Sequence, residues 1–469
     1  MSDLQNLVQQ YGQAHLLRWW DELSSDEQAN LEARIREIDF ETIRSVWQNS
    51  RNADSASASD SSRADRAQPP RSVVYQPQSD EDRAEQREHA EIGQQLLADG
   101  KVGVITVAGG QGSRLGFDQP KGMFPIGPVT DRTLFRIFAE QILARRRRHR
   151  GSIPWLIMTS AATHQDTVDY FETNGFFDLG RDSVHFFQQG SMPAVDDESG
   201  RILMASKSTI CLSPDGHGGL VTALDRSGLL KKMIEQNVEH LFYHQVDNPT
   251  VIMCDPVLIG LHHAHQSQLT TNVVRKREAT EKMGVLAEVD GRTEIIEYSE
   301  LTPEQAARED ENGQWVFWAG NTAIHVFRRD FFEELASDGC RLELHVAHKK
   351  VAHIDEDGKE VYPEEPNANK FERFIFDALP LADRTLIVEG DRDREFNPVK
   401  NADGNDSPAT AKAALNRIAK AWLQQCGVDV ANDADVEISP LQALDADELC
   451  RKIQAGEVDP QQLQSTASA

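Results

Sequence analysis

The sequence has 469 residues, which is enough for a large catalytic domain with smaller appendages. Its 49 Lys and Arg residues are outnumbered by 76 Asp and Glu residues, so the formal net charge is -27. Nucleic acids and anionic membranes bind clustered positive charge, and this balance argues against both as partners. Five dispersed cysteines and an N-terminus without a leader pattern predict a reducing, cytoplasmic compartment and no disulfide framework.

The first part of the chain is expected to lie outside the catalytic domain. Residues 1–50 have a helical pattern, in which Ser25 and Gln28 form a capping box. Residues 51–82 are rich in Ser, Ala and Asp, and they predict a flexible linker or a loosely draped strap.

Strands and helices alternate over residues 83–406, the expected catalytic domain. Amphipathic helices are predicted over residues 84–97 and from Leu134 onward. Apolar runs predict strands at Val102–Val107, Trp155–Met158, Leu241–Val246, Val285–Val289 and Val316–Trp318. This alternation predicts an α/β fold with a doubly wound, mostly parallel, Rossmann-like sheet, which binds ligands beyond the carboxyl ends of its strands. A small C-terminal segment over 407–469 follows, with a helix at Pro408–Gln425 and a short strand at 437–441.

A glycine-rich loop, Ala108–Gly112 (AGGQG), follows the strand that ends at Val107. Glycines let backbone N–H groups approach phosphate oxygens, and Arg114 and Lys121 can add positive charge to the same cradle. The loop is not a dinucleotide fingerprint, because Leu115 stands at the third glycine position. It is not a Walker A loop either, because no hydroxyl residue follows Lys121. A phosphate-binding loop of another class is indicated.

Later blocks carry side chains suited to a nucleotide and its metal. Gln189 is the second glutamine of the sequence FFQQG. A side-chain amide both donates and accepts hydrogen bonds, which suits the edge of uracil. Gly216 and His217 belong to a second glycine-rich loop, SPDGHGG. Asp247 ends an apolar strand, where a carboxylate can hold Mg²⁺ together with substrate phosphates. The blocks EYSE, AGN, NANKFE and EFNPVKN follow.

These blocks resemble the signature of the eukaryotic-type uridylyltransferases (UDPGP type 1), most closely the UDP-N-acetylhexosamine pyrophosphorylases. The family pattern is a strand, then L-A-G-G-Q-G-T-R-L-G, then P-K, and this chain differs from it by Val107 and Ser113. The resemblance implies a nucleotide-diphospho-sugar transferase fold. It also implies that UTP and N-acetylglucosamine 1-phosphate are converted to UDP-N-acetylglucosamine and diphosphate, with Mg²⁺ or Mn²⁺ as cofactor.

The resemblance further assigns roles to individual residues. The residues expected in catalysis are Arg114, Lys121 and Lys400. Those expected at UTP are Val107, Ala108, Gly109, Gly110, Lys121, Gln189, Gly216, Asp247 and Lys370. Those expected at the sugar are His217, Glu297, Tyr298, Asn321 and Lys400. Asp247 is the expected metal ligand.

The sugar and the assembly stay open at this point. The acetamido-sugar enzymes usually carry asparagine where this chain has His217, and the Gly-His-Gly sequence is closer to the UDP-glucose enzymes. Glucose 1-phosphate, or a broad range of sugar phosphates, is therefore the alternative. A catalytically silent sugar-nucleotide sensor would lose the lysines or Asp247, all of which are present. The expected partners are UTP and a sugar 1-phosphate, and the chain is expected to be a monomer or a small homo-oligomer.

Overall fold

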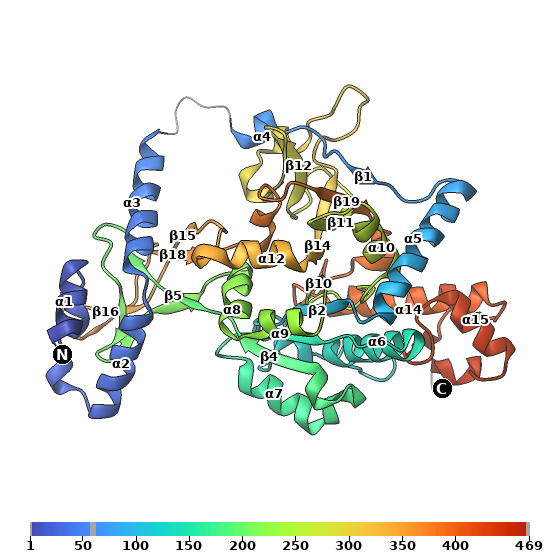
Figure 1. Ribbon diagram of the computed structural model, residues 1–469, viewed down its shortest axis with the longest axis horizontal. Coiled ribbons are helices and arrows are strands. Elements are labelled where there is room, and N and C mark those ends of the chain that lie inside the picture. Colours follow the sequence, from blue (N-terminus) through green and yellow to red (C-terminus); the bar gives the residue numbers. More distant parts are fainter. Residues whose placement is uncertain (1, 57–61, 466–469) are drawn as a thin grey trace. The chain divides into compact units, whose positions relative to one another are not determined.

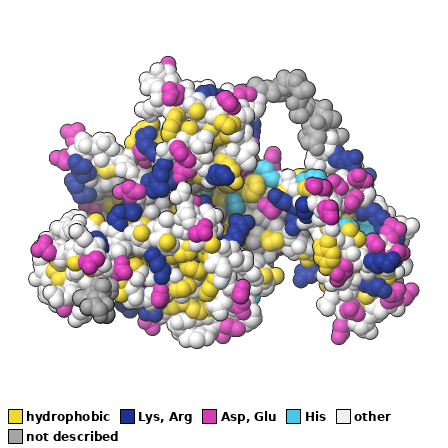
Figure 2. Space-filling view, turned by 180° about the vertical axis from the view of Figure 1, so that it is seen from behind, with side chains coloured by type: hydrophobic (Ala, Val, Ile, Leu, Met, Phe, Trp, Pro, Cys, Tyr) yellow, Lys and Arg dark blue, Asp and Glu magenta, His cyan; other side chains and the backbone are white. Residues whose placement is uncertain are grey.

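The structure is a computed structural model that describes residues 2–56 and 62–465. The chain forms two compact units, and each is described by itself. The N-terminal unit contains residues 2–56, 189–222 and 340–377, and the sheet unit contains residues 62–188, 223–339 and 378–465. Within these ranges no helix has the length and apolarity to cross a membrane. On the face that Figure 2 shows, basic and acidic side chains are interspersed.

The sheet unit is built around a ten-stranded sheet in the order β1-β19-β11-β14-β10-β2-β3-β4, with β12 and β13 attached beside β14 (Figure 1). Only β14 of the ordered path runs against its neighbours, so the sheet is mostly parallel. The bounds are β1 Val73–Val74, β2 Val102–Val107, β3 Trp155–Thr159, β4 Val184–Gln188, β10 His240–Gln245, β11 Leu269–Arg275, β12 Val285–Val289, β13 Arg292–Ile296, β14 Ala319–Arg328 and β19 Thr385–Glu389.

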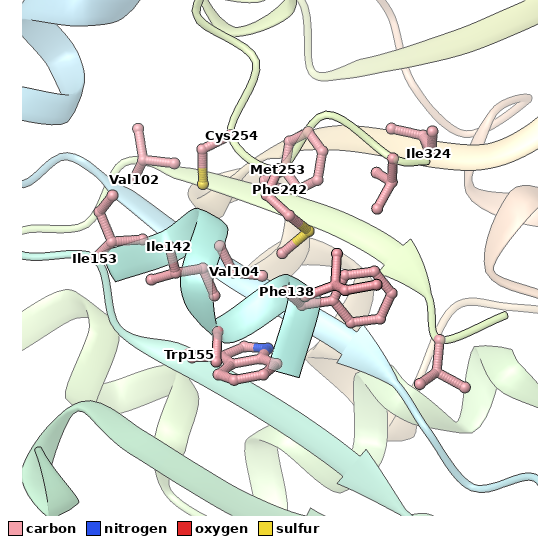
Figure 3. Packing of buried hydrophobic residues seen from close by; sticks show 14 of the residues in the cluster. Val102, Val104, Phe138, Ile142, Ile153, Trp155, Phe242, Met253, Cys254 and Ile324 are labelled. Carbon is pink, nitrogen blue, oxygen red and sulfur yellow. The ribbon is translucent and has the colours of Figure 1, made fainter. Parts of the chain in front are cut away.

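Helices cover both faces of this sheet, which confirms the doubly wound prediction. On one face, Val104 and Phe242 of the strands pack with Phe138 of α6 in the main core (Figure 3). On the other face, the ring of Phe327 meets Phe332 of α12 edge to face. The helices are α4 Arg63–Arg66, α5 Asp80–Ala98, α6 Leu134–His149, α7 His164–Thr173, α9 Leu229–Glu235, α10 Pro256–Ala264, α11 Pro303–Ala306, α12 Arg329–Ala336, α13 Arg392–Glu395, α14 Pro408–Gln425 and α15 Ala446–Gln454.

The N-terminal unit joins helices from the start of the chain to two later segments. Leu4, Leu31 and Ile35 from its helices share a core with Val195 and Phe371. Its helices are α1 Ser2–Gln10, α2 Ser25–Glu37 and α3 Phe40–Ala56. Its strands are β5 Ser191–Pro193, β6 Val195–Asp196, β7 Met204–Ser206, β8 Thr209–Ile210, β9 Leu212–Pro214, β15 His345–Lys349, β16 His353–Ile354, β17 Glu360–Val361 and β18 Ala368–Glu372.

Several local predictions need correction. The capping box at the start of α2 pairs Ser24 with Glu27, one residue before the expected pair Ser25 and Gln28. Val316–Trp318 is not a strand, because β14 begins only at Ala319.

The expected linker is structured in its second half, and the C-terminal strand is shifted. Residues 63–66 form α4, and β1 pairs in parallel with β19, so this stretch is a strap held to the sheet unit. The short strand expected at 437–441 is wrong, since β20 covers Asp435–Val436 and pairs with β21, Gln464–Ser465. The expected domain limits at 50, 82 and 406 stay predictions.

The prediction that cysteines remain unpaired is wrong for two of them. Cys426 and Cys450 form a disulfide, with their Cα atoms 4.8 Å apart. The fold brings the end of α14 beside α15, so residues 24 positions apart in sequence become neighbours. Cys211, Cys254 and Cys340 carry free thiols.

Candidate active site

The glycine-rich loop and Asp247 leave the sheet from neighbouring strands at one edge. β2 and β10 are parallel, and Val107 pairs with Gln245 as the last residue of each strand. The amide of Val246 then donates to the Val107 carbonyl at 3.0 Å. Ligands of open α/β sheets bind at this carboxyl edge, so the structure places the loop and the aspartate where the chemistry is expected.

The loop folds back on itself and presents Lys121. The amide of Gly112 donates to the Gln119 carbonyl at 2.9 Å, and the amide of Lys121 donates to the Gly110 carbonyl at 3.1 Å. Gly110 is exposed. Arg114 is also exposed, and within the described ranges it has no ion pair. The loop therefore offers backbone N–H groups and two cations to an anion.

A third segment reaches the same edge from the end of the sheet unit. The amide of Val399 donates to the Asp247 carbonyl at 2.8 Å, and Lys121 Nζ donates to the Val399 carbonyl at 3.3 Å. Lys400 follows directly, is exposed, and holds its Nζ 5.6 Å from the centre of the Phe396 ring. Three segments far apart in sequence thus bring Lys121, Asp247 and Lys400 into one neighbourhood.

Three of the residues expected at the sugar, Glu297, Tyr298 and Asn321, form a second group in the sheet unit. The amide of Asn321 donates to the Gly284 carbonyl at 2.8 Å, and a Cβ at Gly284 would lie 2.9 Å from Glu297 Oε1. Glu297 and Asn321 therefore both lie next to Gly284, the residue before β12. Tyr298 is 46% exposed next to them. On β14, Asn321 precedes His325, the partner of Tyr243 on β10, so Asn321 lies toward the edge that carries Asp247.

The remaining expected residues belong to the N-terminal unit. Gln189 Nε2 donates to the Gly216 carbonyl at 2.6 Å. Gly216 has a φ of 80°, and a Cβ there would lie 2.3 Å from the Arg373 carbonyl oxygen, so the loop requires glycine. Lys370 lies on β18, the strand that leads to Arg373. The structure thus brings Gln189 to Gly216, and Gly216 to the end of the strand that carries Lys370.

His217 has a defined protonation state and two aromatic neighbours that the sequence analysis missed. Its Nδ1 accepts a hydrogen bond from the amide of Ile375 at 3.1 Å. Burial lowers the pKa of His217 to about 4, so the ring is neutral near pH 7 and carries its proton on Nε2. The rings of Phe374 and Phe376 each lie 5.4 Å from the imidazole. The alternation of aromatic residues in the sequence RFIFD was the available signal.

Two features define the class of protein: a mostly parallel sheet with a phosphate-type loop at its carboxyl edge, and lysines and an aspartate gathered there. This arrangement is that of a nucleotidyltransferase. The family model described as UTP--glucose-1-phosphate uridylyltransferase matches residues 48–427. The chain therefore belongs to this uridylyltransferase family, and it is a uridylyltransferase.

Individual relatives are similar to this chain over nearly its full length. A probable UDP-N-acetylglucosamine pyrophosphorylase of Dictyostelium discoideum is 32% identical, with 95% of this chain and 94% of the relative covered. The UDP-N-acetylglucosamine pyrophosphorylase of Saccharomyces cerevisiae is 34% identical, with 94% of each chain covered. The inhibitor complex of the uridine diphosphate N-acetylglucosamine pyrophosphorylase of Trypanosoma brucei matches with a TM-score of 0.82 and 26% identity, over 97% of this chain and 95% of that one.

Proposed function

We propose that this enzyme transfers the uridylyl group of UTP to N-acetylglucosamine 1-phosphate, giving UDP-N-acetylglucosamine and diphosphate. The observation that carries the proposal is the convergence of the glycine-rich loop, Lys121, Asp247 and Lys400 at one edge of the sheet. The names of the full-length relatives support the acetamido sugar as acceptor. A silent sensor would not need this set of cations and a carboxylate.

The reaction is an in-line substitution at phosphorus. An oxygen of the sugar phosphate attacks the α-phosphorus of UTP, a new P–O bond forms, and the bond to the leaving diphosphate breaks. The attacking oxygen is already anionic near pH 7, so no general base is required. The protein then has to align the two substrates and neutralise crowded phosphate charge. We assign this work to the N–H groups of Gly109 and Gly110, to Arg114, and to Lys121, Lys370 and Lys400. The N–H group of Ala108, also expected at UTP, instead donates to the Met158 carbonyl at 2.8 Å.

Asp247 is suited to hold Mg²⁺ or Mn²⁺. Its carboxylate is partly exposed and has no hydrogen-bond or ion-pair partner among the residues described. The described residues contain no group of three or more His, Cys, Asp or Glu side chains placed for a metal. Magnesium commonly uses one or two carboxylates with substrate phosphates, so a single aspartate fits. When bound, the ion supplies positive charge that stabilises the phosphates during transfer.

The surroundings of His217 favour an acetamido sugar over glucose. Phe374 and Phe376 place apolar surface beside the residue expected at the sugar, and an acetamido methyl group can bury against such surface. His217 Nε2–H remains available as a donor for a sugar oxygen, because Nδ1 is used by the backbone. Glucose 1-phosphate and a broader range of sugar phosphates are the alternatives.

A substrate panel tests the reaction. Purified protein with UTP and Mg²⁺ is offered the 1-phosphates of N-acetylglucosamine, N-acetylgalactosamine, glucose and galactose, and diphosphate release is measured. We expect the highest kcat/KM with N-acetylglucosamine 1-phosphate and no turnover when a chelator removes the metal. Asp247→Ala should raise the metal concentration needed for half-maximal rate. Turnover that is unchanged by the chelator would exclude the metal assignment, and no turnover with any sugar would exclude the reaction.

The variant His217→Asn tests the sugar site. We expect it to change the ratio of kcat/KM between N-acetylglucosamine 1-phosphate and glucose 1-phosphate by roughly 10-fold or more in favour of the acetamido sugar. His348→Asn is the matched control, since His348 is half-exposed in the same unit and pairs with Asp197. A ratio that stays at the wild-type value in His217→Asn would remove this residue from the sugar site.

The cytoplasmic location and the oligomeric state stay predictions.

A further inference from the structure

The Lys400 segment and the strand end at Asp247 are connected by one side chain in particular, that of Asn248. Asn248 directly follows Asp247 and is buried, with 3% of its surface exposed. Its Nδ2 donates to the Glu395 carbonyl at 2.6 Å. Its Oδ1 accepts from the amide of Asn397 at 3.2 Å. The two ends of one side-chain amide thus bond to the main chain of two residues on the opposite segment.

This pattern imitates the pairing of two strands. A main-chain peptide would offer one donor and one acceptor to residues i and i+2 of a neighbour, and the Asn248 amide offers the same two groups. Aspartate has no donor for the Glu395 carbonyl, and leucine, although similar in shape, has neither group. The residue type is therefore determined by the two main-chain partners.

The segment held in this way carries the groups that the reaction uses. Val399 bonds to the Asp247 carbonyl and also accepts from Lys121 Nζ, and Lys400 is the next residue. A displacement of residues 395–400 would thus move Lys400 relative to Asp247 and would remove the acceptor of Lys121. Asn248 can thus affect the geometry of the site without touching a substrate, because both ends of its side-chain amide are bonded to the protein.

We propose that Asn248 is a positioning residue, which fixes Lys400 relative to Asp247 by pairing its side-chain amide with the main chain of Glu395 and Asn397. Its effect on catalysis rests on the proposed function, whereas its effect on residues 395–400 does not. Neither the family match nor the sequence motifs assign this residue a role.

The first experiment measures amide hydrogen exchange of peptides that cover residues 395–400. Asn248→Leu keeps the branched shape of the side chain and removes its hydrogen bonds to Glu395 and Asn397, together with the two that Oδ1 accepts from Thr250. Asn248→Ser is a milder change in case the leucine variant does not fold. The matched control is Asn416→Ala, which removes an asparagine whose amide accepts from the Val436 main chain and donates to Asp435 in the C-terminal segment. We expect exchange at least about tenfold faster in residues 395–400 for the Asn248 variants alone. Unchanged exchange there would overturn the proposal.

The second experiment is a double-mutant cycle on kcat/KM with Lys400→Ala. If Asn248 acts by placing Lys400, Asn248→Leu should lower kcat/KM by roughly 10- to 100-fold in the wild type and by less than about threefold in the Lys400→Ala background. Equal losses in both backgrounds would mean that Asn248 acts independently of Lys400, which would also overturn the proposal. If the wild type turns over no sugar phosphate, the proposed function fails. The exchange experiment still decides whether Asn248 holds residues 395–400 in place.

Discussion

Gly110 and Gly122 lie on the same loop, and replacing each with alanine should have a different effect. We expect Gly110→Ala to lower activity and Gly122→Ala to lower stability. A Cβ at Gly110 would meet no described atom within 4 Å, and its φ lies outside the left-handed region. A Cβ at Gly122 would lie 2.1 Å from the ring of Phe135, which is fully buried. Carbon atoms normally approach to about 3.5–4.0 Å, so only the second methyl group has no room in the protein itself.

The magnitudes follow from these two environments. Overpacking a core costs about 1–3 kcal/mol, and Phe135 cannot swing into solvent, so Gly122→Ala should lower Tm by roughly 2–5 °C. Gly110→Ala should leave Tm within about 2 °C, because an unstrained Gly→Ala change is worth about 0.4–1 kcal/mol. Its methyl group would instead occupy the space of the UTP phosphates, and kcat/KM should fall by roughly 100-fold.

The assay is a thermal melt combined with initial rates of diphosphate release for both variants and the wild type. If Gly110→Ala keeps kcat/KM within about threefold of the wild type, the loop does not approach the phosphates. If Gly122→Ala melts at the wild-type temperature, Phe135 does not pack tightly against Gly122, and the steric reasoning is wrong.

Three further predictions concern charge, pH and thiols. Lys121→Ala should lower kcat/KM by roughly 10²–10³ with an unchanged Tm, and a loss below threefold would take this lysine out of the site. Burial lowers the pKa of His244 to about 3, below its value in the unfolded chain, so its stabilising contribution is complete above about pH 6.5 and is lost as pH falls toward 3. The urea midpoint should therefore decrease from pH 7 to pH 5, and a midpoint that is constant over this range would contradict the assignment. Thiol titration of protein unfolded without reductant should find three free thiols, since Cys426 and Cys450 are paired, and a count of five would refute the disulfide.

The sequence predicted the central strands well because burial on both faces leaves a continuous apolar run. Val102–Val107 and Val285–Val289 begin and end as predicted. The same signal misled at Val316–Trp318, where Val316 and Phe317 are buried in a small core without pairing to a strand. An apolar run reports burial, and burial in a turn looks the same in the sequence as burial in a strand.

For the site, the sequence was enough to predict which residues belong to motifs, but it was not enough to predict which of them contact one another. Asp247 and Lys121 stand in recognisable blocks, yet only the fold shows that both contact Val399. Phe374 and Phe376 were missed because aromatic residues in an α/β protein usually belong to the core. The Cys426–Cys450 pair could not be predicted, because its two helices are brought together by the tertiary fold.

The pairing of β1 with β19 has a consequence for the order in which the chain assembles. β2, β3 and β4 follow one another in the sequence and are neighbours in the sheet, so this part can form while the chain is still being synthesised. Val73 was made earlier than any of them, yet its partner is Ile387. β1 must therefore remain unpaired until β19 has left the ribosome, and a chain truncated before β19 would expose this strand to chaperones and proteases.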